Sequence, residues 1–153
     1  MVLYLVQHGQ SQPKEIDPEK GLSDEGRAEV ELIAKVAQGY AIPVKAIKHS
    51  GKKRARQTAD IFASFLQPNT KTEAIKGVNP LDDVALFAET AEDMDGQMLV
   101  GHLPFMARLT SYLITGTIDT PIFRFQNGGI VCLVKDQDAQ FWIIKWSLMP
   151  KIG

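Results

Sequence analysis

The sequence predicts an α/β fold, a three-layer sandwich in which a mixed, mostly parallel sheet is flanked by helices. Short apolar segments alternate along the chain with longer segments whose apolar residues recur at helical spacing. Strands separated by helices favour right-handed βαβ units and a parallel sheet. Near the end of the chain, two strand-like segments with only a short turn between them predict an antiparallel pair. Because the 153 residues contain no repeat or linker, we expect one domain, residues 1–153.

Each element has its own signal in the sequence. A first helix is predicted after Ser23, whose hydroxyl can cap it, and is expected to end at Gly39. Further helical stripes begin near residues 52, 81 and 105. The strands are expected where short apolar runs occur, at residues 2–6, 44–48, 70–75, 97–100, 130–135 and 140–146.

The composition is that of an ordinary soluble protein, with 44% hydrophobic and 23% charged residues. A net charge of -1 gives no overall attraction to nucleic acid or to an anionic membrane. Cys132 is the one cysteine, so the chain has no internal disulfide, and the three histidines show no spacing typical of a metal site. No apolar run approaches a membrane span or a signal-peptide core, so we expect a cytoplasmic protein.

Polar residues follow each of the first four expected strands. His8 follows the first strand, residues 49–54 follow the second, residues 79–83 follow the third, and His102 follows the fourth. In open α/β sheets, ligands bind beyond the carboxyl ends of the parallel strands. The sequence therefore predicts that these groups converge on one rim of the sheet.

The residue types at this rim suit a phosphoryl group. Arg54 lies near the start of the second expected helix, where free backbone amides and a guanidinium fork both favour an anion. His8 and His102 each adjoin a glycine, and an imidazole can attack phosphorus and hold the group as phosphohistidine. His49 is expected either to be structural or to be exposed at the rim.

Four motifs occur in order along the chain: Gln7-His8-Gly9, Gly21-Leu22-Ser23-Asp24-Glu25-Gly26, Ser50 with Arg54-Ala55-Arg56-Gln57-Thr58-Ala59, and Val100-Gly101-His102-Leu103-Pro104. Together they resemble the histidine phosphatase superfamily. The short length, the Val78-Asn79-Pro80 loop and the Trp146-Ser147-Leu148-Met149-Pro150 ending are most similar to the small bacterial phosphohistidine phosphatases of the SixA type. The resemblance covers nearly the whole chain and implies a fold like that of phosphoglycerate mutase.

The resemblance implies a role for each matching residue. His8 would be the nucleophile that becomes phosphorylated, and Arg54 would bind the transferred group. His102 would hydrogen-bond that group in the transition state, with Gln7 and Gly9 also at the phosphate. The family implies no metal and no organic cofactor.

The resemblance implies a phosphatase that dephosphorylates proteins in signal transduction. The substrate would be a phosphorylated protein, such as a histidine phosphotransfer or signalling protein, or a small phosphate ester, with inorganic phosphate as product. The chain has no insertion that forms a lid over a small metabolite, which favours a protein substrate and argues against a mutase.

Two positions depart from the family pattern. Gln7 stands where the family has an arginine directly before the nucleophile, and Gly51 stands where we expect proline. Losing one charged donor from such a site costs about 10²–10³ in rate. Three interpretations are open: a slow enzyme, replacement of the charge by Lys52 or Lys53, or a catalytically silent module that binds phosphate or phosphoprotein.

The general acid is the last open question. Many branches of the superfamily place a carboxylate after the third strand, and Asp82 and Asp83 lie there. The same position begins a predicted helix, where acidic residues also stabilise the helix dipole. Both interpretations therefore stand for these two aspartates.

Overall fold

A six-stranded mixed sheet forms the centre of the computed structural model, which describes residues 1–152. The strand order is β3-β2-β4-β1-β5-β6, and the first four strands of the chain are parallel to one another. β5 pairs antiparallel with both β1 and β6, which confirms the predicted sheet. The strands are β1 (Val2–Gln7), β2 (Ala46–His49), β3 (Glu73–Ala74), β4 (Gln97–Gly101), β5 (Ile130–Val134) and β6 (Ile143–Leu148).

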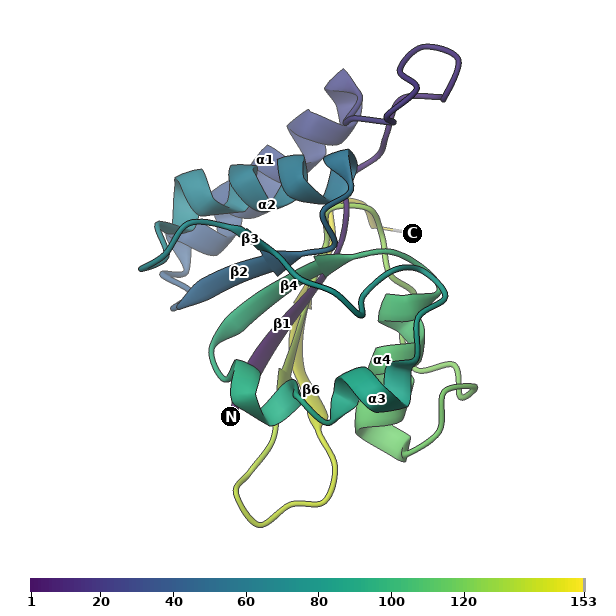
Figure 1. Cartoon of the computed structure of the whole chain (residues 1–153). Helices are drawn as coiled ribbons and strands as arrows, with labels where there is room; N and C mark the ends of the chain where they lie inside the picture. Colours follow the sequence, from purple (N-terminus) through teal and green to yellow (C-terminus); the bar gives the residue numbers. More distant parts are fainter. Residues whose placement is uncertain (153) are drawn as a thin grey trace.

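Helices cover both faces of the sheet and complete the three layers (Figure 1). α1 (Asp24–Gly39) and α2 (Lys53–Leu66) pack on one face. α3 (Val84–Ala88), the 3₁₀ turn η1 (Ala91–Met94) and α4 (Phe105–Thr115) pack on the other. Among the described residues, none of these helices has the length and apolar character needed to cross a membrane.

The central strand β1 shows why the sheet needs cover on both sides. Tyr4 and Val6 join the core beneath α1 and α2, whereas Leu3 and Leu5 join the core beneath α4. Alternate side chains of a strand point to opposite faces, so an apolar run such as this one is buried only between two layers. This packing fixes β1 in the middle, with its carboxyl end at the rim of the sheet.

The first helix begins as its sequence predicts. The Ser23 hydroxyl accepts a hydrogen bond from the amide of Gly26 at 3.0 Å, and Asp24 opens α1. The helix ends at Gly39, as predicted, and Tyr40 is its C-cap. The sequence thus placed this helix to within one residue.

Three expected elements differ from the structure. β3 has two residues instead of six and pairs only with β2, at the edge of the sheet. The apolar stripe that begins at Leu81 forms only the five-residue α3. Asp83 is the N-cap of this helix, because its carboxylate accepts from the Leu86 amide, and the residues before Asp83 form a turn. β6 begins at Ile143 rather than at residue 140.

The late start of β6 changes the position of a tryptophan. Trp142 and Trp146 are four residues apart and were expected on one strand, yet they pack on opposite faces of the sheet. Trp142 precedes the strand, and its amide donates to the Leu113 carbonyl instead of joining the ladder. A register irregularity between Cys132 and Leu133 further shifts the pairing of β6.

Candidate active site

His8 lies directly after β1, at the carboxyl edge of the parallel strands. Its Nδ1 is 2.7 Å from the Gly9 carbonyl oxygen. Because a carbonyl only accepts hydrogen bonds, Nδ1 carries the ring proton and donates it, which leaves the lone pair on Nε2. Gly9 packs closely on α1, since a Cβ at this position would lie 2.7 Å from Cγ2 of Val30. The glycine therefore permits the close packing that holds the imidazole.

Burial keeps the His8 imidazole neutral. It lowers the pKa of His8 from 6.5 to about 4, against the opposing effect of the hydrogen bond to Gly9. The positive charges of Arg54 and Lys20 lower this pKa further. A neutral imidazole with an unprotonated Nε2 is the form that can attack phosphorus at neutral pH.

Arg54 reaches His8 from the first turn of α2. Its Nε donates to Nε2 of His8 at 3.3 Å, so the guanidinium lies at the atom expected to attack. The N-cap residue of α2, Lys52, offers no side-chain hydrogen bond to the helix amides. A guanidinium beside an uncapped helix N-terminus suits an anion that contacts Nε2 of His8.

His102 follows β4 and meets His8 across the edge of the sheet. The centroids of the two rings are 5.0 Å apart, and His102 is fully buried. Its Nε2 is 2.6 Å from Oγ of Ser50, while its Nδ1 is buried and has no hydrogen-bond partner among residues 1–152. Burial, followed by the charges near His8, Arg54 and Lys52, lowers the pKa of His102 to about 3.

Gln7 and Gly9 flank the nucleophile, but their polar groups are used differently. Oε1 of Gln7 is buried without a hydrogen-bond partner in the described chain, which costs about 1–3 kcal/mol. The Gly9 amide donates to Oγ1 of Thr58 at 2.9 Å. That amide is thus engaged within the protein in this structure, whereas a phosphate contact was expected.

Asp82 and Asp83 both accept local backbone hydrogen bonds. Oδ2 of Asp82 accepts from the Asn79 amide at 2.8 Å, and Oδ1 of Asp83 accepts from the Leu86 amide at 3.1 Å. These contacts shape the turn before α3 and cap that helix. They are the contacts expected if the two residues have a structural role.

The two candidate replacement lysines differ in their surroundings. Nζ of Lys53 lies 2.9 Å from Asp17 and 3.6 Å from Glu19, so its charge is compensated. Lys52 is exposed and makes no ion pair within residues 1–152. Its charge is close enough to His102 to lower the pKa of that imidazole. Of the two, Lys52 is the one available to an incoming anion.

Two residues reach the site without having been assigned a role from the sequence. Ser50 contacts His102, and Nδ2 of Asn127 donates to the main-chain carbonyl of His8 at 2.9 Å. Ser50 belongs to the same motif as Arg54, and its position directly after a strand could have indicated that it lies at the site. Asn127 lies 119 residues from His8, and nothing local in the sequence points to this contact.

The loop after β2 explains the second departure from the family pattern. Gly51 has a φ of +88°, a conformation that proline cannot adopt. Its amide donates to Nδ1 of the buried His49 at 3.0 Å. His49 thus supports the loop that carries Ser50, in agreement with a structural role.

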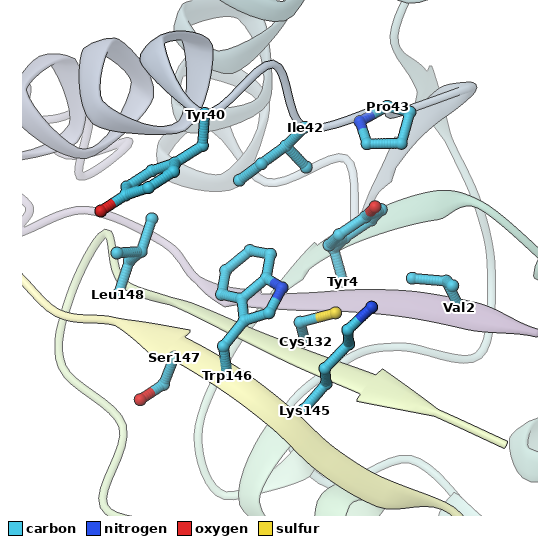
Figure 2. Close-up of a pocket in the computed structure, with 10 residues that line it drawn as sticks. All are labelled: Val2, Tyr4, Tyr40, Ile42, Pro43, Cys132, Lys145, Trp146, Ser147 and Leu148. Atoms are coloured by element: carbon cyan, nitrogen blue, oxygen red, sulfur yellow. The ribbon is translucent and has the colours of Figure 1, made fainter.

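A separate apolar cavity of about 610 Å³ lies away from these histidines (Figure 2). It opens between the turn after α1 and the strands β1, β5 and β6. Tyr4 and Trp146 contribute rings to its wall, and Lys145 is its one charged side chain. None of the residues predicted for the active site lines it.

Comparison with known proteins identifies the family. Residues 3–79 match the model of the histidine phosphatase superfamily, branch 1. The chain belongs to this superfamily. The match includes His8 and Arg54, and family membership supports a phosphatase function. No curated protein sequence matches the chain significantly.

Solved structures of phosphatases share the fold over nearly the full chain. The protein histidine phosphatase SixA complexed with tungstate has a TM-score of 0.84 at 22% identity, covering 98% of this chain and 97% of that one. A putative phosphohistidine phosphatase SixA from Agrobacterium tumefaciens has a TM-score of 0.75 at 25% identity, covering 97% of each chain. The alpha-ribazole phosphatase from Shigella flexneri has a TM-score of 0.79 at 15% identity, covering 100% and 98%.

Proposed function

We propose that this protein hydrolyses phosphorylated histidine on a protein through a phosphohistidine intermediate at His8. The observation that carries the proposal is the hydrogen bond from Nδ1 of His8 to the Gly9 carbonyl, which directs the Nε2 lone pair toward Arg54. The membership of the chain in the histidine phosphatase superfamily supports the same chemistry.

The reaction has two transfers. Nε2 of His8 attacks phosphorus as the bond to the leaving imidazole breaks. The leaving imidazole, already protonated by solvent at its other ring nitrogen, keeps the electron pair and departs as a neutral ring. Water then attacks the phosphoryl group on His8, which releases inorganic phosphate and restores the neutral imidazole. Arg54 and His102 stabilise the negative charge on the transferred oxygens in both steps.

A histidine-bound phosphoryl group fits the acid–base groups at this site. The P–N bond of phosphohistidine becomes labile once its own imidazole is protonated, so a carboxylic acid is not required. Asp82 and Asp83 are engaged with backbone amides of their own loop. We therefore give neither aspartate a proton-transfer step, and a phosphate ester with a poor leaving group should react slowly.

The glutamine before the nucleophile sets the rate in this proposal. Gln7 brings no charge, and Lys53 is paired with Asp17. Arg54 is then the one cation in hydrogen-bond contact with His8 among residues 1–152, with Lys52 and Lys20 contributing weaker, solvent-screened charge. Such a site binds a phosphoryl group and turns over more slowly than one with two guanidinium groups.

The alternative function is a catalytically silent module that binds phosphate or phosphoprotein. The neutral side chain of Gln7 favours it, because an amide binds a phosphoryl group less strongly than the arginine expected at this position. A module of this kind would still gain about 2.7 kcal/mol of stability from a phosphate analogue at 100 times its dissociation constant.

The test compares the chain with Gln7→Arg and His8→Ala on a phosphohistidine peptide and on p-nitrophenyl phosphate. We expect slow hydrolysis by the chain, none by His8→Ala, and hydrolysis about 10²-fold faster by Gln7→Arg. Acid-labile, alkali-stable phosphate should appear on the protein and be absent from His8→Ala. If the chain is as inactive as His8→Ala while vanadate still raises its melting temperature, the silent module is the correct function.

A further inference from the structure

A shallow apolar groove of about 400 Å³ is lined by residues of the chain segments that directly follow His102 and directly precede Gln126 and Asn127. One wall is formed by Leu103 and Ala107, at the start of α4, and the other by residues 121–125. Both walls are directly connected to the site. Leu103 follows His102 in the chain, and the segment 121–125 leads to Asn127, whose side chain donates to the His8 carbonyl.

The groove is exposed and apolar, with preformed walls. Leu103 is 41% exposed although it is a large apolar residue. The rings of Phe123 and Phe125 pack edge to face, with centroids 5.7 Å apart and an interplanar angle of 84°. Such a pair is held in place by its own contacts, so the wall needs little rearrangement to bind a ligand.

The charge at the groove indicates the kind of ligand. Arg124 is exposed beside the groove and makes no ion pair within residues 1–152. No acidic residue lines the groove. The surface therefore complements an apolar side chain that is accompanied by a carboxylate or another anion.

We propose that this groove binds an apolar side chain of the phosphorylated protein, next in space to the phosphohistidine that enters the active site. The inference rests on the proposed function, which it deepens by naming what the substrate must carry beside its phosphate. A small phosphate ester bound at His8 lacks a second group for the groove, so only a protein substrate gains from it.

The test measures binding, so that it does not depend on turnover. The probes are two fluorescein-labelled peptides that carry a non-hydrolysable phosphonate analogue of phosphohistidine, flanked by leucines in one and by serines in the other. The variants are Ile122→Glu, which puts a charge in the groove, and Ala107→Trp, which fills it. Ile118→Glu is the matched control, since Ile118 is exposed four residues earlier and does not line the groove.

We expect the leucine peptide to bind about ten-fold more tightly than the serine peptide, a difference of about 1.4 kcal/mol. Ile122→Glu and Ala107→Trp should abolish this difference, and Ile118→Glu should preserve it. Hydrolysis of p-nitrophenyl phosphate should be the same in all three variants and in the unmodified chain.

Three outcomes would overturn the groove assignment. The two peptides could bind equally tightly, or neither could bind. Alternatively, Ile118→Glu could reduce the affinity difference between the peptides as much as Ile122→Glu does. Failure of the proposed function gives a different result, because it appears as absent hydrolysis by the unmodified chain whatever the peptides do. The peptide comparison decides the role of the groove in either case.

Discussion

The central strand β1 connects two regions of very different chemistry. At Tyr4, in the middle of the strand, it contributes to the apolar cavity with Trp146 and Cys132 (Figure 2). At its carboxyl end, Gln7 and His8 lie in the cluster that we propose to be catalytic. The cavity is lined mainly by apolar side chains, whereas the histidines and the arginine that we propose to be catalytic lie at the other region.

Burial acts on both regions and has opposite consequences for acids and bases. Burial raises the pKa of Tyr4 to about 12 and that of Cys132 to about 11. It lowers the pKa of His8 to about 4 and that of His102 to about 3. All four side chains are therefore neutral at pH 7, but neutrality makes a thiol or a phenol unreactive and leaves an imidazole with a nucleophilic lone pair.

The largest expected effect of a substitution is on activity, and it should occur at the proposed active site and not at the apolar cavity. Arg54→Ala should lower kcat/KM for a phosphohistidine peptide by about 10³-fold, because it removes the guanidinium that contacts Nε2 of His8. Tyr40→Ala, an exposed residue of the cavity wall, should change kcat/KM by less than about two-fold. Equal losses in the two variants would show that the cavity belongs to the active site.

The second effect is on stability at acid pH. The pKa of the His8 imidazole is about 4 in the folded chain and 6.5 in the unfolded chain. As the pH falls, His8 of the unfolded chain is therefore protonated at a higher pH than His8 of the folded chain. The free energy of unfolding should therefore decrease between pH 6.5 and pH 4, with His8 contributing on the order of 3 kcal/mol of the loss.

Urea denaturation of His8→Gln and Tyr4→Phe across this range measures that contribution. His8→Gln should show a smaller loss of stability than the unmodified chain. Tyr4→Phe should show the same loss, since Tyr4 does not titrate at acid pH. A slope unchanged by His8→Gln would mean that His8 is not held neutral by burial.

The third effect concerns the hydroxyl that contacts His102. Ser50→Ala removes the 2.6 Å contact to Nε2 and should lower kcat by about five- to ten-fold, the equivalent of one hydrogen bond. Ser50→Thr keeps a hydroxyl at this position and should restore most of the rate. Steady-state kinetics with p-nitrophenyl phosphate would show the pattern, and failure of threonine to rescue would argue for packing instead.

The smallest effect distinguishes two neighbouring lysines. Lys52→Gln should raise KM for an anionic substrate by about three-fold, and added salt should reduce the difference. Lys53→Gln should have less effect on KM, because the charge of Lys53 is already compensated by Asp17. A larger effect at Lys53, persisting in 0.5 M salt, would contradict this assignment.

The sequence alone determined the elements that depend on local chemistry. The apolar run of β1, the Ser23 cap and the helical stripes reflect side-chain periodicity and hydrogen bonding within a few residues. The order of elements along the chain also places His8 and His102 directly after strands and Arg54 at the start of a helix. Parallel topology then brings such positions to one edge of the sheet.

Only the tertiary structure decided how the side chains meet. The contact between Ser50 and His102 joins residues 52 apart, and Asn127 reaches the His8 carbonyl over 119 residues. Three other features depend on neighbours that folding brings together. Trp142 and Trp146 pack on opposite faces of the sheet, β3 is short, and Lys53 pairs with Asp17. Local propensity cannot encode such contacts, because their energy exists only when distant segments pack against each other.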